Sequence, residues 1–147
     1  MAITLPEFGG LLVHVLGQMM TAAGYTLLES PVQQAGGLFR FTRALPDGTR
    51  LTVDFQVLVY QDAPDRFQPV LSRVVAGAGR DAGSHAERIT LPRLVVDVFG
   101  VRVLPHADHW WPFQDVSTAG EGLLEAGKLL VAYGLPWLEG TLQPPGG

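Results

Sequence analysis

The chain has 147 residues, of which 47% are hydrophobic and 16% charged, a composition that excludes intrinsic disorder and is typical of one compact domain. Lys and Arg number 10 against 14 Asp and Glu, and the resulting net charge of -4 opposes binding to the phosphate backbone of nucleic acid. The absence of cysteine excludes disulfides, thiol nucleophiles and cysteine-ligated metal sites.

The first predicted element is a helix from Pro6 to Ala23. Thr4 and Glu7 have the spacing of a capping box at its start, and Gly24 can end it in a left-handed conformation. Its apolar residues recur at three- and four-residue intervals, which is the period of one buried helical stripe. They are Phe8, Leu11, Leu12, Val15, Leu16, Met19 and Ala22.

Two strands with alternating apolar residues follow, joined by a turn at Pro46-Asp47-Gly48. The apolar side chains of their shared face are Phe39, Phe41, Leu51, Val53, Phe55, Val57 and Val59. A two-residue turn would pair Phe41 with Asp54, which places a core residue beside a charge. A three-residue turn pairs Phe41 with Val53 and Arg40 with Asp54. We therefore predict the three-residue turn, with positive φ at Gly48.

Further extended segments are predicted from Phe67 to Ala76 and across much of Ile89 to Leu104, separated by a glycine-rich loop over residues 77–84. Pro69 and Pro92 lie within these segments. Because proline has no backbone N–H to donate to a sheet, each is predicted at a strand edge, a strand start or a short break.

The last predicted element is a helix from Ala119 to Tyr133, with Thr118 and Glu121 as its capping pair. One apolar side is predicted, formed by Leu123, Leu124, Leu130 and Val131. Gly134 and then Pro136 are predicted to stop this helix, and a flexible tail is expected from about residue 141.

The element order α-β-β-β-β-α predicts a single α+β domain over residues 1–147. Short connections favour an antiparallel sheet of about four strands, and the two terminal helices are expected to cover the face of Phe39, Phe41, Val53, Phe55 and Val57. The chain shows no secretion signal, and no apolar run reaches the roughly 20 residues of a membrane helix. We therefore expect a cytoplasmic protein with neither a membrane nor nucleic acid as a partner.

The opposite sheet face is the predicted ligand or interaction surface. It gathers hydrogen-bonding groups around an aromatic ring, namely Arg40, Thr42, Thr52, Asp54, Gln56 and Tyr60. A small molecule, another protein or a second copy of the chain in a homodimer could use this face, and a solvated surface is the alternative. Trp110 and Trp111 are further candidates for this surface. Neighbours in an extended chain point oppositely, so one can pack in the core while the other forms part of a groove wall.

A short run of potential metal ligands, His106, Asp108 and His109, precedes the tryptophans. Its spacing is not that of a recognised metal motif, and we therefore favour an exposed polar loop over a metal site. No nucleophile or cofactor motif is complete. The sequence therefore predicts a non-catalytic binding or protein-interaction domain without a cofactor, and the alternative is a small metal-dependent hydrolase or other enzyme that uses these three residues.

Four short motifs also carry a resemblance. They are the segments Asp108-His109-Trp110-Trp111 and Pro136-Trp137-Leu138-Glu139 and, earlier in the chain, Phe55-Gln56 and Arg88-Ile89. Together they resemble the uncharacterised bacterial family called domain of unknown function 4304. The resemblance implies a small α+β domain. It implies no reaction and no catalytic residue.

Overall fold

The computed structural model describes residues 3–75 and 85–145 of the chain. Its first element is helix α1 (Leu5–Ala22). The predicted capping box is confirmed: the Thr4 hydroxyl accepts from the Glu7 N–H at 3.2 Å, and Glu7 Oε1 accepts from the Thr4 N–H at 3.0 Å. Gly24, with φ 92°, follows the helix, and the Tyr25 N–H reaches back to the Met20 carbonyl at 2.9 Å. The buried stripe is Phe8, Leu12, Leu16 and Met20.

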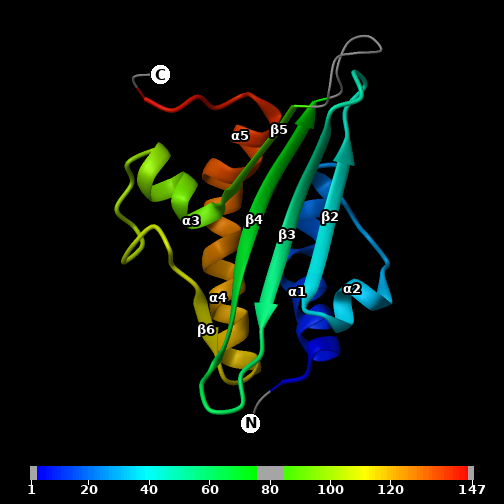
Figure 1. Ribbon diagram of the computed structural model, residues 1–147, viewed down its shortest axis with the longest axis vertical. Helices are drawn as coiled ribbons and strands as arrows, with labels where there is room; N and C mark the ends of the chain where they lie inside the picture. The colour runs from blue at the N-terminus through cyan, green and yellow to red at the C-terminus, as the bar shows by residue number, and fades with distance from the viewer. Residues whose placement is uncertain (1–2, 76–84, 146–147) are drawn as a thin grey trace.

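A six-stranded antiparallel sheet forms the second layer, in the order β1-β2-β3-β4-β5 with β6 also paired to β4 (Figure 1). The strands are β1 (Thr26–Leu27), β2 (Leu38–Ala44), β3 (Arg50–Leu58), β4 (Asp65–Val75), β5 (His85–Thr90) and β6 (Trp111–Phe113). The predicted α+β class and antiparallel sheet are confirmed. The two strands beyond the predicted four are β1 and β6, and they are too short to show a period in the sequence.

The predicted register of the central hairpin is confirmed. Phe41 pairs with Val53, and Arg40 pairs with Asp54. The Leu45 N–H donates to the Thr49 carbonyl at 2.8 Å, which leaves residues 46–48 as the loop. Gly48 has φ 89°, a conformation that favours glycine.

Strand β4 pairs along one edge with two strands in succession. Its residues Asp65–Phe67 pair with β6, and Val70–Val75 pair with β5. Pro69 falls in the gap between them, so on that edge neither strand needs a donor from it. Of the three places predicted for Pro69, it occupies a short break only in the pairing along this edge, because β4 itself continues through Pro69 and pairs there with β3. The predicted glycine-rich loop over residues 77–84 lies outside the described residues.

The extended segment predicted across residues 89–104 is wrong beyond Thr90. The chain turns there into α3 (Leu91–Arg93) and a π-helical turn, η1 (Leu94–Val98). The Thr90 hydroxyl caps this start by accepting from the Arg93 N–H at 3.3 Å, and Pro92 sits in the first turn, where its missing N–H costs nothing. Leu91 and Leu94 are fully buried, so packing explains why this apolar run is helical rather than extended.

The C-terminal helical segment also differs from its prediction at both ends. Helix α4 (Val116–Leu129) starts earlier, at an Asp115 cap whose carboxylate accepts from the Thr118 N–H at 2.8 Å. The chain then continues through a π-helical turn, η2 (Leu130–Gly134), into α5 (Leu135–Glu139). Pro136 does not stop it, because it occupies the first turn of α5, where no N–H donor is required. Gly140, with φ 78°, ends the segment.

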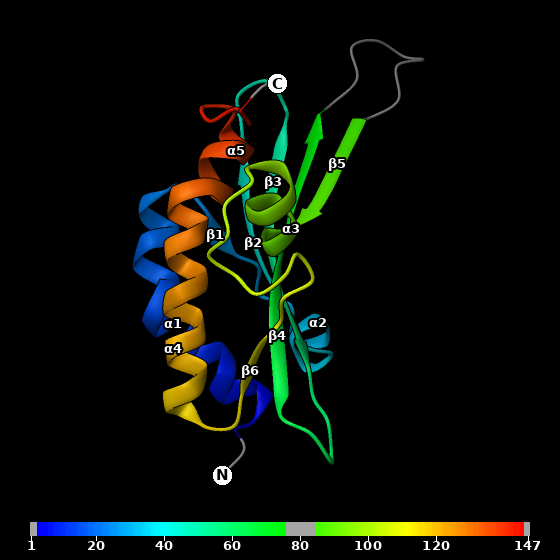
Figure 2. The same ribbon diagram turned by 90° about the vertical axis from the view of Figure 1, so that its left-hand side faces the viewer.

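Helices α1 and α4 lie side by side on one face of the sheet (Figure 2). A Cβ atom at Gly127 would lie 2.5 Å from Leu16 Cδ2, so the two helices approach closely through this glycine. The face that α4 buries is formed by Ala119, Gly122, Leu123, Ala126 and Gly127. Leu124 and Val131, predicted on that side, are each 54% exposed, because one residue turns a helix by about 100° and their neighbours Leu123 and Leu130 face the core.

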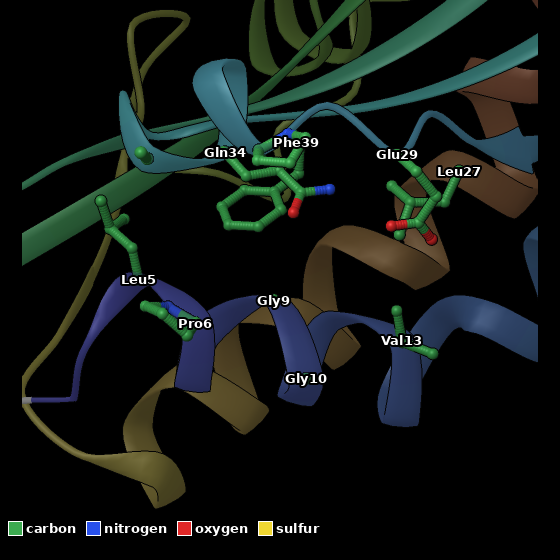
Figure 3. Close-up of a pocket in the computed structure, with 11 residues that line it drawn as sticks. Leu5, Pro6, Gly9, Gly10, Val13, Leu27, Glu29, Gln34 and Phe39 are labelled. Carbon is green, nitrogen blue, oxygen red and sulfur yellow. The ribbon is translucent and has the colours of Figure 1, made fainter.

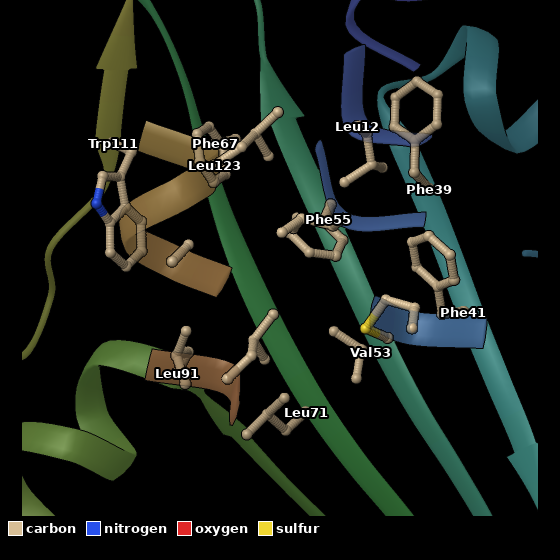
Figure 4. Packing of buried hydrophobic residues seen from close by; sticks show 14 of the residues in the cluster. Leu12, Phe39, Phe41, Val53, Phe55, Phe67, Leu71, Leu91, Trp111 and Leu123 are labelled. Carbon is tan, nitrogen blue, oxygen red and sulfur yellow. The ribbon is translucent and has the colours of Figure 1, made fainter. Parts of the chain in front are cut away.

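The core lies between this helix pair and the sheet (Figure 4). The five sheet residues predicted to line it, Phe39, Phe41, Val53, Phe55 and Val57, are all buried. Phe67 stacks on Trp111 with ring centroids 5.6 Å apart and also contacts the rings of Phe8 and Phe55. No described helix is long and apolar enough to cross a membrane.

Candidate functional site

The face of the sheet that α1 and α4 leave uncovered carries most of the predicted interaction residues (Figure 2). Arg40 and Asp54 face each other across β2 and β3, with Nε–Oδ1 at 2.7 Å and Nη2–Oδ2 at 2.9 Å. This two-bond contact raises the pKa of the Arg40 guanidinium. Asp54 is only 2% exposed, so the pair satisfies itself rather than presenting two free charges.

Further polar residues extend this open face. Thr52 and Thr42 pair across β2 and β3, and Gln56 pairs with Gln68 across β3 and β4. The Gln68 amide nitrogen donates to the His109 carbonyl at 3.0 Å, which ties the segment before β6 to the sheet. Gln68 was not predicted, although continuing the alternation from β3 into β4 would have found it.

An arginine between two aromatic rings forms one end of the open face. The guanidinium carbon of Arg66 lies 5.3 Å from the centre of the Tyr60 ring and 5.0 Å from that of Trp110. The Tyr60 N–H donates to Asp65 Oδ1 at 3.0 Å, which holds the loop after β3 in place. The structure therefore brings Tyr60 and Trp110 together through Arg66, a residue that no sequence pattern indicated.

Trp111 lies on the other side of the sheet. It is 4% exposed, and its Nε1 donates to Glu125 Oε1 at 3.0 Å. The expectation that one of the two tryptophans is a core residue is confirmed, because successive side chains of an extended strand point to opposite faces. Of the two candidates, Trp110 alone belongs with the open face.

The three predicted metal candidates do not form a ligand set. Asp108 Oδ1 accepts from Arg93 Nη2 at 2.9 Å, and the rings of His106 and His109 are 6.0 Å apart. Burial against Trp111, 4.7 Å away, lowers the pKa of His109. Within residues 3–75 and 85–145, no group of three or more His, Asp or Glu side chains could hold a metal ion.

A large cavity lies elsewhere, between α1 and the segment formed by β1 and the short helix α2 (Pro31–Ala35) (Figure 3). Its volume is about 820 Å³, within the range of small-molecule sites. Its lining is mostly apolar and consists of Leu5, Pro6, Gly9, Gly10, Val13, Leu27, Glu29, Pro31, Gln34, Ala35 and Phe39. We call this the α1–α2 pocket.

Two adjacent glycines, Gly9 and Gly10, lie in the α1 wall of the pocket. A Cβ atom at Gly9 would lie 2.7 Å from the Phe39 ring, so the helix meets the sheet closely there. A Cβ atom at Gly10 would have no heavy atom within 4 Å. In the sequence these glycines only lower helix propensity, and nothing else in the sequence indicated a pocket.

The pocket has two polar side chains, Glu29 and Gln34. Figure 3 shows both reaching toward the space above α1. Gln34 Nε2 donates to the Leu28 carbonyl at 3.3 Å, which leaves the amide oxygen as an acceptor. Glu29 also borders a second hollow of about 700 Å³ along α1, so the carboxylate stands where the two hollows meet.

No family model, curated protein or solved structure matches this chain. The resemblance to domain of unknown function 4304 therefore stays a prediction. Its motif residues have clear packing roles: Leu138 is fully buried, and Glu139 Oε1 bonds Arg43 Nη1 at 2.8 Å. These contacts explain the residues by stability without assigning them a reaction.

Proposed function

We propose that this protein is a non-catalytic binding module that holds a small apolar molecule in the α1–α2 pocket. The supporting observation is the cavity of about 820 Å³ with an apolar lining. Pockets of this size with a few polar groups bury most of a drug-sized ligand. Apolar burial then supplies the binding free energy, and the polar groups orient the ligand.

The chemistry of the lining supports binding rather than catalysis. The eleven residues that form it include no serine, cysteine, histidine or lysine, so the pocket itself offers no ordinary nucleophile and no imidazole base. Its one carboxylate, Glu29, has no partner within the pocket that could act as a second catalytic group. A single carboxylate and a single amide are suited to recognition.

A matched pair of glycine substitutions tests this proposal. Gly10→Leu places a side chain in the pocket, whereas Gly120→Leu adds the same side chain to α4, outside the pocket, where a Cβ atom also meets nothing within 4 Å. Both changes raise helix propensity by a similar amount. The probe is N-phenyl-1-naphthylamine, a neutral apolar dye whose fluorescence rises on leaving water.

We expect the wild type and Gly120→Leu to bind the dye with similar affinity and Gly10→Leu to bind it about tenfold more weakly. Thermal unfolding of all three proteins checks that they are folded. Equal dye binding by Gly10→Leu, or no binding by the wild type, would contradict the proposal.

A further inference from the structure

The α1–α2 pocket carries a charge that an apolar ligand alone would not use. Glu29 is exposed, and within the described residues its carboxylate makes no hydrogen bond or ion pair. A carboxylate accepts hydrogen bonds and donates none. It therefore stands where the apolar pocket meets a second hollow, lined in part by His14, Gln18 and Thr21, with its hydrogen-bonding capacity unused.

The second polar group of the pocket, the Gln34 amide, also offers a hydrogen-bond acceptor. Because Gln34 Nε2 donates to the Leu28 carbonyl, the amide is oriented with its oxygen free, and among described residues that oxygen accepts no hydrogen bond. Two acceptors thus border the same apolar space. A ligand that matches them must bring donors, and a positive charge matches Glu29 best.

The net charge of the molecule also favours a cationic ligand. The net charge is -4, and no Lys, Arg or His side chain lines the pocket. An anionic head group would therefore meet a carboxylate with no compensating cation, which costs binding free energy. A neutral ligand without O–H or N–H groups would leave both acceptors unpaired.

We infer that the ligand of the α1–α2 pocket is an amphipathic organic amine, whose apolar body fills the cavity and whose ammonium group bonds Glu29 and the Gln34 amide oxygen. This inference rests on the proposed function, since it names the ligand class of the same pocket. The primary ammonium has three donors, enough for both acceptors.

Three ten-carbon probes of different charge separate this inference from simple apolar binding. They are decylamine, 1-decanol and decanoate, each titrated by calorimetry below its aggregation limit at low ionic strength. Glu29→Gln removes the carboxylate but keeps the shape. Glu121→Gln, on the exposed side of α4, removes the same net charge away from the pocket and is the matched control.

We expect the wild type and Glu121→Gln to bind decylamine about three- to tenfold more tightly than 1-decanol, and decanoate most weakly. The affinity of Glu29→Gln for decylamine should fall to its affinity for 1-decanol. The affinity for 1-decanol itself should be the same in Glu29→Gln and the wild type. Added salt should reduce the preference for the amine, because screening weakens an exposed charge contact.

The outcomes distinguish the two proposals. Equal binding of all three probes by the wild type, or an amine preference that survives in Glu29→Gln, overturns the amine inference and leaves the apolar pocket standing. Binding of none of the probes overturns both. Strongest binding of decanoate would overturn the charge argument directly.

Discussion

The two faces of the sheet are built from the same strands but reach burial by different means. Phe55 and Gln56 are neighbours in the chain, and their side chains point to opposite faces. On the helix-covered face, α1 and α4 exclude water and Phe55 is fully buried. On the open face, Asp54 is 2% exposed because Arg40 bonds across it. Low exposure on a sheet therefore does not by itself mean a hydrophobic core.

The largest expected effect lies on the helix-covered face. Phe55→Ala should lower the free energy of unfolding by about 3 to 5 kcal/mol, because it removes a fully buried ring that contacts Phe41 and Phe67. Gln56→Ala, one residue along on the open face, should change it by about 0.5 kcal/mol or less. Urea denaturation of both variants measures the contrast. Similar losses for the two would remove the distinction between the faces.

The Arg40–Asp54 pair tests whether the open face has a structural role of its own. Arg40→Met keeps an apolar stem over Asp54 but removes both hydrogen bonds, so we expect a loss of about 1.5 to 3 kcal/mol. A double-mutant cycle with Asp54→Asn, followed by urea denaturation, gives the coupling between the two residues. A coupling near zero would show that the pair behaves like a solvated surface ion pair.

His109, in the segment just before β6, should make the free energy of unfolding depend on pH. Burial keeps the pKa of His109 below the usual value for histidine, so the unfolded chain takes up its proton at higher pH than the folded one. Stability from His109 is complete above about pH 6.5 and is lost as the pH falls below it. His109→Gln should therefore lose less stability than the wild type between pH 7.5 and 5.5 in urea titrations.

The carboxylates whose pKa values are lowered serve as the internal control for this pH effect. Glu7, Asp47 and Asp115 accept hydrogen bonds from backbone N–H groups, so their contribution is lost only in more acidic solution. The wild type and His109→Gln should share that loss below about pH 4.5. If the wild type and His109→Gln lose the same free energy of unfolding between pH 7.5 and 5.5, His109 is solvated.

A stability effect smaller than those of Phe55→Ala and Arg40→Met is expected for the double variant Gln56→Arg and Tyr60→Ala on the open face. Its free energy of unfolding should stay within about 1 kcal/mol of the wild type, since it loses one ring contact with Arg66. Its mass in solution, measured by light scattering, tests the homodimer prediction. If the open face joins two copies, the wild type is a dimer and the variant a monomer. An unchanged dimer would place the contact elsewhere.

Local sequence signals determined the elements whose energetics are local. The spacing of Thr4 and Glu7 determined the start of α1, because both partners lie within one helical turn. Alternation and the turn at Gly48 determined the register of β2 with β3, since a one-residue slip would bury Asp54 among phenylalanines. The same register placed Arg40, Asp54 and Gln56 on one face in advance of any structure.

Only the tertiary structure decided the features that depend on distant contacts. Leu91 and Leu94 became helical because their burial outweighs a weak extended preference. The chain passes Gly134 and Pro136 as helix because Leu135, between them, and Leu138, after them, are buried. The α1–α2 pocket exists only where α1 meets β1 and α2, and neither of those short elements has a readable period. Packing between distant segments decided these features, and the local periodicity of a sequence carries no information about such packing.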